Sequence, residues 1–274
     1  MCNSLAGAGR ADLFTEKITA ELSGNHIAYS VFKNNWPASL DGYTDVFIVG
    51  GDGTLNYFIN HYPGIKLPLV IFNAGTGNDF HWLLYGNKNF EEQFLIALHN
   101  DPKPIDIGKC NEYLFINGVG VGFEGEVAKA LTGKKKRPGK TSFLITILKR
   151  IFTYRSKKYF IRSAEKELSG KKLLIDVSNG KRAGGGFNIA PESKADDGLF
   201  DIIIADALNS LQRLRYLPVI EKGKHLKLSF IDYYCSRKML IESDQLIQFH
   251  LDGEYFEAPA LKIEIIPAAL NFRF

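Results

Sequence analysis

The chain is poor in the residues that form covalent cross-links and metal frameworks. Its 274 residues include only three cysteines, Cys2, Cys110 and Cys235, which lie far apart without paired metal-ligand spacing. A disulfide framework and a zinc site are therefore not indicated, and a reducing cytoplasm fits best. The six histidines also lack ligand spacing, and no serine lies in a nucleophile-elbow pattern. Hydrolysis through a covalent intermediate is not indicated.

Long apolar runs are also missing. No uninterrupted stretch approaches the roughly 18 residues that can span a bilayer. The amino terminus lacks the charged and apolar regions of a signal peptide. Since 45% of the residues are hydrophobic, the chain can still bury a core. We expect a soluble, cytoplasmic protein with one large domain or two modest ones.

Negative charge is absent from one segment. Residues 133–158 contain ten basic residues and no acidic one, although the net charge of the whole chain is only +4. Several of the basic residues flank an apolar helix candidate at Phe143 to Phe152. This pattern is typical of a helix that docks on an anionic membrane surface, and about equally of a solvated loop followed by a core helix. Nucleic acid is not indicated, because no binding motif accompanies the charges.

The pattern of expected secondary structure changes near residue 104. Before it, short apolar strands alternate with helical stretches, as in a parallel sheet covered on both faces. After it most segments read as strands separated by turns, which predicts an antiparallel sandwich. We expect an α/β domain at 1–103 and a β-sandwich domain at 104–274, with the last residues packing back on the first domain. The candidate strands include Ile27 to Phe32 and Lys224 to Ile231.

One glycine-rich turn follows a buried strand candidate. Gly50 to Asn56 comes directly after an apolar run, Val46 to Val49, and precedes a helix candidate. Three glycines in four positions let a bulky anion approach the backbone amides, so a phosphate is expected here. Asp52 strengthens this interpretation, because a carboxylate beside phosphate needs a metal or a reacting hydroxyl to account for it. The alternative is a strand-to-helix turn without a ligand.

Two further glycine-rich loops should lie beside this one. Asn3 to Arg10 precedes the first helix candidate, and Gly75 to Phe80 follows the strand candidate that ends at Phe72. The carboxyl ends of parallel strands share one edge of a sheet, so the three loops should converge on one crevice. The sequence therefore predicts a nucleotide site built without a P-loop. Gly120 to Gly125 matches a dinucleotide fingerprint, but close packing of a helix on a sheet is the better interpretation of this lone match.

Two acidic turns mark the second half of the chain. Asp196-Asp197-Gly198 and Asp252-Gly253-Glu254 each place carboxylates next to a strand candidate. Such acids could hold Mg²⁺ or act as a general base. The alternative is ordinary turn chemistry, because Asp-Gly is a favoured hairpin dipeptide.

Together these motifs resemble the diacylglycerol kinase catalytic-domain family, particularly its soluble bacterial lipid kinases, with sphingosine and ceramide kinases as more distant relatives. The resemblance covers nearly the whole chain. The Gly-Gly-Asp-Gly-Thr motif alone is shared with NAD kinases, so the lipid-kinase assignment depends on the Asp-Asp-Gly and Asp-Gly-Glu elements. The matching stretches are Asn3 to Arg10, Gly50 to Asn56, Gly75 to Phe80, Asp106 to Gly108, Asn117 to Phe123, Ala190 to Gly198, Asp252 to Glu254, and Pro267 with Leu270.

The resemblance implies transfer of phosphate from ATP to a hydroxyl of diacylglycerol or a related lipid. Glu254 would be the general base, and Asp52 would orient Mg²⁺ or help to activate the acceptor. Asp197 would bind a structural Mg²⁺ with the carbonyls of Lys194 and Leu199. The expected partner is a lipid at an anionic membrane surface, and homodimer formation is left open. The expected ATP site comprises Asn3, Ser4, Leu5, Ala6, Gly7, Gly50, Gly51, Asp52, Gly53, Thr54, Leu55, Asn56, Gly75, Thr76, Asn78 and Asp79.

Three departures from the family pattern bear on this expectation. Ser4 stands where a proline is usual, Tyr57 where a glutamate is usual, and His81 and Trp82 where small and basic residues are common. These changes leave open a soluble-metabolite kinase of the NAD kinase type, or a nucleotide-binding regulator without catalysis. Only Met1 and Cys2 precede the first loop, where the family has a whole strand. Either the true start lies upstream of Met1, which we expect, or the sheet lacks a central strand.

Overall fold

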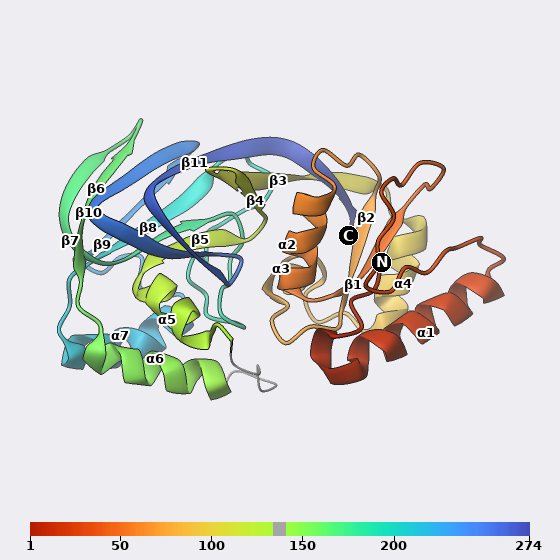
Figure 1. The fold of residues 1–274 in the computed structure, drawn as a ribbon, viewed down its shortest axis with the longest axis horizontal. Coiled ribbons are helices and arrows are strands. Elements are labelled where there is room, and N and C mark those ends of the chain that lie inside the picture. Colours follow the sequence, from red (N-terminus) through yellow and green to blue (C-terminus); the bar gives the residue numbers. More distant parts are fainter. Residues whose placement is uncertain (134–140) are drawn as a thin grey trace. The chain divides into compact units, whose positions relative to one another are not determined.

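The protein is described by a computed structural model that covers residues 1–133 and 141–274 (Figure 1). Half of the ten basic residues noted above, Lys134 to Arg137 and Lys140, lie outside the described residues. The described chain divides into two compact units. Unit 1 comprises residues 1–105 and 268–274, and unit 2 comprises residues 106–267.

Unit 1 is an α/β unit. β1 and β2 pair in parallel, with Val46 opposite Leu69 and Gly50 opposite Asn73, so both strands end at the same edge. Figure 1 shows α2 and α3 on one side of these strands and α1 and α4 on the other. A capping box, in which Asn89 and Glu92 exchange side-chain and backbone hydrogen bonds, fixes the start of α4. The elements are η1 (Ala6–Gly9), α1 (Arg10–Gly24), β1 (Val46–Gly50), α2 (Asp52–His61), β2 (Leu69–Asn73), α3 (Asp79–Tyr85), α4 (Phe90–His99) and the first residues of β3 (Pro102–Cys110).

The strand expected at Ile27 to Phe32 is wrong. The segment is extended, but its pairing is limited to a bond from Cys2 N to Phe32 O, 2.8 Å, and a parallel bridge between Cys2 and Lys33. The apolar side chains of Ile27, Tyr29 and Val31 are exposed. Their alternation resembles that of a strand with one buried face, but no element of unit 1 covers that face.

Unit 2 is built mainly from antiparallel strands. Between residues 106 and 267, every residue pairing given for the described strands runs antiparallel. The end of β11 belongs to unit 1, where Phe272 pairs in parallel with Leu69 of β2. The inward side chains form a large apolar core, which includes Val121, Ile175, Ile202 and Phe249. The elements are β4 (Tyr113–Phe115), β5 (Gly118–Gly122), α5 (Phe123–Leu131), α6 (Thr141–Thr153), β6 (Lys157–Ser163), β7 (Glu167–Ser178), β8 (Phe200–Asp206), α7 (Ser210–Glu221), β9 (Ile231–Ser236), β10 (Lys238–Leu251) and β11 (Glu254–Arg273).

α5, α6 and α7 lie along one side of the strands of unit 2 (Figure 1). Val127 of α5, Ile147 and Ile151 of α6, and Phe187 form their shared apolar cluster. The helix candidate at Phe143 to Phe152 is therefore confirmed as α6. Within the described residues, no helix is both long enough and apolar enough to cross a bilayer.

The strand expected at Lys224 to Ile231 is wrong, and a helix before it was missed. Residues 224–230 form turns, and only Ile231 begins a strand, β9. α7 (Ser210–Glu221) buries none of its residues and contains Pro218, so its apolar periodicity is weak. Its start does carry a sequence signal, a capping box between Asn209 and Gln212.

The Gly-x-Gly segment at 120–125 joins a strand to a helix by close packing. A Cβ atom on Gly125 of α5 would lie 2.2 Å from the carbonyl oxygen of Gln248 on β10. No residue but glycine fits that approach. The close-packing interpretation of this segment is therefore confirmed.

Candidate functional site

Two of the three predicted loops of unit 1 lie against each other at the ends of β1 and β2. The carbonyl oxygen of Gly50 accepts hydrogen bonds from Ala74 N, 2.9 Å, and Gly75 N, 3.2 Å. A Cβ atom on Gly75 would lie 2.3 Å from the Cα atom of Gly51, and one on Gly51 would lie 2.6 Å from the carbonyl oxygen of Gly77. The glycines are required because the two backbones touch.

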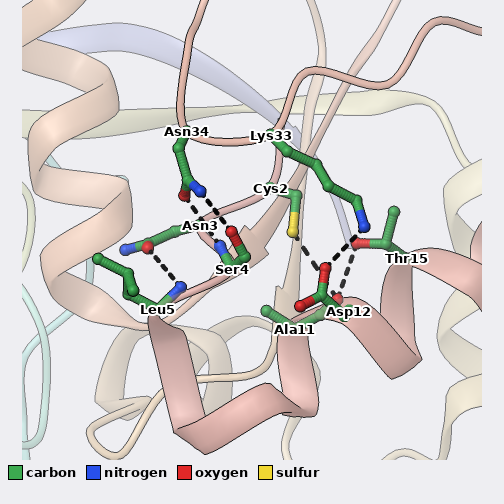
Figure 2. Close-up of polar contacts among 9 residues, drawn as sticks. All are labelled: Cys2, Asn3, Ser4, Leu5, Ala11, Asp12, Thr15, Lys33 and Asn34. Atoms are coloured by element: carbon green, nitrogen blue, oxygen red, sulfur yellow. Dashed lines mark hydrogen bonds and ion pairs between the residues drawn. The ribbon is translucent and has the colours of Figure 1, made fainter.

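The amino-terminal loop joins the same edge. Asn3 N donates to the carbonyl of Val49, 3.2 Å, which places the loop beside the end of β1. The side-chain amide of Asn3 donates to Thr54 Oγ1, 3.1 Å. Its oxygen accepts from Leu5 N, 3.1 Å, within the loop (Figure 2). Asn3 therefore fixes its own loop and links it to the first turn of α2.

The amino-terminal loop also reaches the loop after β2. Gly7 has a φ of +61°, and a Cβ atom there would lie 2.0 Å from the carbonyl oxygen of Ala74. The guanidinium of Arg10 donates to the carbonyls of Gly7 and Gly75. The structure thus brings all three glycine-rich loops together, as the strand order predicts, and it adds a cation that the sequence analysis did not single out.

Ser4 is held by a side chain from elsewhere in unit 1 (Figure 2). Ser4 N donates to Asn34 Oδ1, 3.1 Å, and the Asn34 amide donates back to Ser4 Oγ. Asn34 adopts the left-handed conformation, with φ +59°, which asparagine tolerates better than most residues. A proline at position 4 would have no N–H to satisfy. The reciprocal pair gives the extra N–H of serine a partner, so this departure is compatible with an ordered loop.

Asp52 accepts hydrogen bonds from the start of another helix. Its carboxylate oxygens accept from Asp79 N, 2.9 Å, and Phe80 N, 3.1 Å, the first two amides of α3. A carboxylate is favourable there, because helix amino termini carry unpaired N–H groups and a positive dipole end. These bonds supply a third account of an acid in a phosphate loop, beyond the metal or reacting hydroxyl considered from the sequence. Asp52 ties the loop after β1 to the loop after β2.

Exposed donors also lie in this part of unit 1. α2 begins directly after Gly51, which provides no side-chain hydrogen bond to the helix start. Thr76 is exposed in the loop after β2. Asn78, in the same loop, bonds back to Gly75 through both its amide atoms, at 3.1 and 2.9 Å. A helix amino terminus, bare glycine backbone and a nearby cation fit a phosphate chain.

Tyr57 belongs to an aromatic cluster formed by α2 and the loop between α1 and β1. Its ring lies 5.1 Å from that of Trp36 and is stacked 5.5 Å from that of His61, measured between centroids. The phenol remains 58% exposed. The cluster gives Tyr57 a packing role in place of the glutamate that is usual in the family.

His81 is part of the core of unit 1. Its Nε2 lies 3.1 Å from Gln93 Oε1, and the Gln93 amide donates to the carbonyl of Ile71 on β2. Burial lowers the pKa of His81, so the ring is neutral near pH 7. This third departure therefore connects α3, α4 and β2.

The Asp-Gly-Glu element is a tight hairpin in unit 2. Asp252 and Gly253 have φ values of +48° and +87°, as in a type I′ turn, and join β10 to β11. The Asp252 carboxylate accepts from Ile116 N, Asn117 N and Gly118 N at 2.9, 2.8 and 3.0 Å. The hairpin interpretation of this dipeptide is correct, and the same turn presents Glu254 on an exposed position at the start of β11.

The Asp-Asp-Gly element is a separate turn of unit 2. Asp197 is exposed, and its carboxylate accepts from Leu199 N, 3.1 Å. Gly198 N donates to the buried carboxylate of Asp106, 2.7 Å. Burial raises the pKa of Asp201 nearby, and the negative charges of neighbouring acids, including Asp197, add to this. A cation at this turn would reduce that repulsion.

The oxygen ligands that this turn could offer suit a hydrated magnesium ion. In the described chain, no three His, Cys, Asp or Glu side chains gather in a metal-binding cluster. A cation would therefore depend on the Asp197 carboxylate, on backbone carbonyls such as those of Lys194 and Leu199, and on water. Such a set fits Mg²⁺, which prefers oxygen ligands and usually keeps several waters.

Comparison with known proteins gives matches along nearly the whole chain. Residues 1–110 match the family described as "Diacylglycerol kinase catalytic domain", and residues 117–273 match the family described as "YegS C-terminal NAD kinase beta sandwich-like domain". A "Probable lipid kinase YegS-like" protein of Shewanella frigidimarina is 28% identical over 241 residues, covering 86% of this chain and 78% of the relative. The "Diacylglycerol kinase" of Bacillus subtilis is 27% identical over 222 residues, covering 80% of this chain and 73% of the relative.

Solved structures with this fold come from two kinds of kinase. A diacylglycerol kinase structure from Bacillus anthracis has a TM-score of 0.73 at 20% identity, covering 99% of this chain and 94% of that chain. An NAD kinase from Archaeoglobus fulgidus, solved in complex with ATP, has a TM-score of 0.56 at 14% identity, covering 95% and 89%. At such identities the likeness shows the fold alone. It confirms the predicted class, an α/β domain followed by an antiparallel β-sandwich.

Proposed function

The chain belongs to the diacylglycerol kinase family, and from this premise we propose that it transfers the γ-phosphoryl group of ATP to a hydroxyl of diacylglycerol or a related lipid. Membership makes it a phosphotransferase with an alcohol group as acceptor. The observation that carries the proposal is the contact of three glycine-rich loops at one edge of unit 1, where Gly51 and Gly75 leave backbone without side chains.

Unit 1 would hold the nucleotide. ATP, when bound, supplies the phosphoryl group. The amino terminus of α2 and the Arg10 guanidinium place positive charge beside the loops, which favours the phosphate chain. The exposed Thr76 hydroxyl can donate to a phosphate oxygen or to the ribose. Asn3 and Asp52 keep the three loops in register through the bonds described above.

Unit 2 would supply the acceptor chemistry. Phosphoryl transfer depends mainly on positioning and charge neutralisation, with an acceptor for the proton of the attacking hydroxyl. The Glu254 carboxylate would take that proton. Mg²⁺, held by Asp197 with the carbonyls of Lys194 and Leu199, would supply fixed positive charge at the Asp-Asp-Gly turn.

The direct test uses ATP labelled on the γ-phosphate and a total lipid extract. We expect a labelled lipid product whose formation requires Mg²⁺, and identification of that product names the acceptor. Labelling of NAD or a sugar without lipid would instead favour the NAD kinase type of activity. Absence of transfer to every acceptor, with ATP bound, would contradict the proposal.

We further propose that this cytoplasmic enzyme docks on anionic membranes through α6 and α7. Leu144, Ile145 and Phe152 of α6 are exposed, at 39%, 49% and 61%. On α7, Leu211 and Leu214 are exposed at 75% and 41%. Exposed apolar side chains on two neighbouring helices suit insertion into the headgroup boundary.

The two helices are joined, and basic residues accompany their apolar positions. The Arg213 guanidinium of α7 donates to the carbonyls of Ile151 and Tyr154, 3.0 and 2.8 Å, at the end of α6. Lys149 and Arg215 are exposed, whereas Arg150 forms an ion pair with Glu126, 3.3 Å. Lys149 and Arg215 are therefore the cations of these helices best placed to meet anionic headgroups.

The combined substitutions Lys149→Gln and Phe152→Ser should weaken vesicle binding. One basic residue contributes about 1 kcal/mol at an anionic surface, and a buried phenylalanine about 1.5–3 kcal/mol. Together these contributions correspond to roughly 60- to 700-fold weaker binding to phosphatidylglycerol vesicles by co-sedimentation, and we expect ATP binding to be unchanged. Leu246→Ser removes an exposed leucine from β10, away from α6 and α7, and is the control. If the double variant and the Leu246→Ser control bind vesicles equally well, α6 only packs against the core and does not dock on membranes.

A further inference from the structure

A histidine holds the turn that presents Glu254. His250 lies on β10, two residues before the turn, and its Nδ1 accepts a hydrogen bond from Gly253 N, 3.3 Å. Gly253 directly precedes Glu254 in the chain. The six histidines show no metal-ligand spacing in the sequence, so no local pattern indicates this role.

The bonded N–H belongs to the central peptide of the turn. In a two-residue hairpin, reversing the peptide between the two turn residues converts a type I′ turn into a type II′ turn, which needs a negative φ at the second residue. Gly253 can adopt either sign of φ, so the residue itself does not prevent this change. The bond to His250 Nδ1 does oppose it, because the N–H would turn away from the ring. A reversed peptide would change the direction in which β11 starts and therefore the position of Glu254.

The imidazole is fixed in place by its surroundings. Only 12% of its side-chain surface is exposed, and its Nε2 lies 3.9 Å from Glu124 Oε2 on α5. His250 pairs with Gly120 of β5, where a Cβ atom would lie 2.3 Å from Nε2. Gly120 therefore provides the space that the ring occupies.

The ring is neutral at physiological pH. Burial lowers the pKa of His250 to about 4. Because Nδ1 accepts a hydrogen bond, the single ring proton lies on Nε2. The acids that face this region are also buried: burial raises the pKa of Glu124 well above its usual value, and that of Asp176 to about 7. Nδ1 thus stays an acceptor throughout the neutral range.

We propose that His250 is a positioning residue for the reaction, which holds the Asp252–Gly253 peptide in the orientation that presents Glu254 to the acceptor hydroxyl. The inference rests on the proposed function, in which Glu254 is the general base. Asp252 anchors one side of the turn through its bonds to residues 116–118, and His250 holds the glycine on the other side.

The test compares two amide substitutions that differ in where they place an acceptor. In His250→Asn the side-chain oxygen can take the place of Nδ1, whereas in His250→Gln the amide reaches the place of Nε2. We expect His250→Gln and His250→Ala to lower kcat by about 10- to 100-fold, as a small misplacement of a reacting group does. The KM for ATP should stay within about twofold of wild type, and His250→Asn should keep most of the turnover. His99→Gln, on the exposed surface of α4, is the control.

Equal kcat for the asparagine, glutamine and wild-type proteins would overturn the proposal. So would an equal loss in the asparagine and glutamine proteins, because general damage to the fold does not distinguish acceptor positions. Hydrogen exchange on the wild-type protein provides a measurement that needs no variant. The Gly253 amide should exchange more slowly than an exposed turn amide such as that of Gly64, and equally fast exchange would contradict the bond.

Turnover of the Glu254 and His250 variants distinguishes an error in the assigned base from an error in the positioning role of His250. If Glu254→Gln keeps full turnover, the assignment of the base is wrong, whatever the histidine variants do. If Glu254→Gln is inactive while His250→Gln matches wild type, the base stands and the positioning role of His250 is wrong.

Discussion

Glu254→Gln should reduce kcat for lipid phosphorylation by roughly 10²- to 10⁴-fold, the usual contribution of a general base. The amide keeps the size of the side chain but cannot accept a proton at neutral pH. Glu254 is exposed at the start of β11, so the fold should be preserved and thermal unfolding should shift little. The affinity for ATP should also stay the same, because the glycine-rich loops belong to unit 1. Initial rates with γ-labelled ATP and lipid vesicles measure the effect.

Glu257→Gln is the matched control for this variant. Glu257 lies on the same strand, is exposed and pairs with Lys129 at 3.2 Å. Loss of an exposed ion pair costs only about 0–1 kcal/mol of stability and leaves the chemistry unaffected. If Glu254→Gln and Glu257→Gln lower kcat to the same extent, the decrease comes from the loss of a negative charge on β11, and Glu254 is not the base.

Asp52→Asn should weaken ATP binding and destabilise unit 1. The carboxylate accepts from Asp79 N and Phe80 N, and one of its oxygens becomes an N–H₂ group in the variant. That group cannot accept a hydrogen bond and would face a helix amide. A hydrogen bond to a charged group contributes about 1.5–3 kcal/mol, so a lower unfolding temperature and roughly a 10-fold higher Kd for ATP are expected. Calorimetry gives both quantities.

The same variant separates two roles for Asp52. A loss of ATP affinity, with kcat reduced less than Kd is raised, supports a positioning role in which the carboxylate joins two loops. An unchanged Kd and unfolding temperature with a kcat lowered more than 100-fold would place Asp52 at the magnesium ion or the acceptor hydroxyl instead. Asp101→Asn, an exposed acid between α4 and β3, is the control for loss of charge alone.

The contact between the glycine-rich loops could be predicted from the sequence for a simple reason. The apolar run Val46 to Val49 marks a buried strand, and such strands end at a common edge when they pair in parallel. The glycines of Gly50 to Asn56 and of Gly75 to Phe80 indicate that backbone or an anion must approach these turns closely. Local pattern and tertiary geometry therefore agree at this site.

The hydrogen-bond partners inside the site could not be predicted in the same way. Asp52 bonds to amides 27 and 28 residues away, and Asn34 reaches Ser4 across 30 residues. Nothing local in the sequence specifies these pairs, because either side chain could bond equally well to water. The support of the Asp-Gly-Glu turn by His250 was missed for a related reason, since a single buried histidine has no sequence signature.

One wrongly predicted strand and one missed helix show where the apolar pattern of the sequence disagrees with the packing. Ile27 to Phe32 alternates like a strand, but unit 1 leaves its apolar residues exposed. The helix at Ser210–Glu221 lacks a buried face, so the apolar pattern that reveals most helices is absent. An apolar periodicity predicts an element correctly only when one of its faces is buried, and neither segment has a buried face.

The sequence by itself determined the family, the two-part α/β and β-sandwich organisation, and the identity of the glycine-rich and acidic turns. Those features depend on short-range rules: glycine where backbones must touch, apolar runs where strands are buried, and Asp-Gly where a hairpin reverses. Only the tertiary structure decided what each acid and histidine does. A carboxylate such as Asp52 or Asp252 acquires its role from the amides that the fold brings to it, and that selection depends on contacts between residues far apart in the chain.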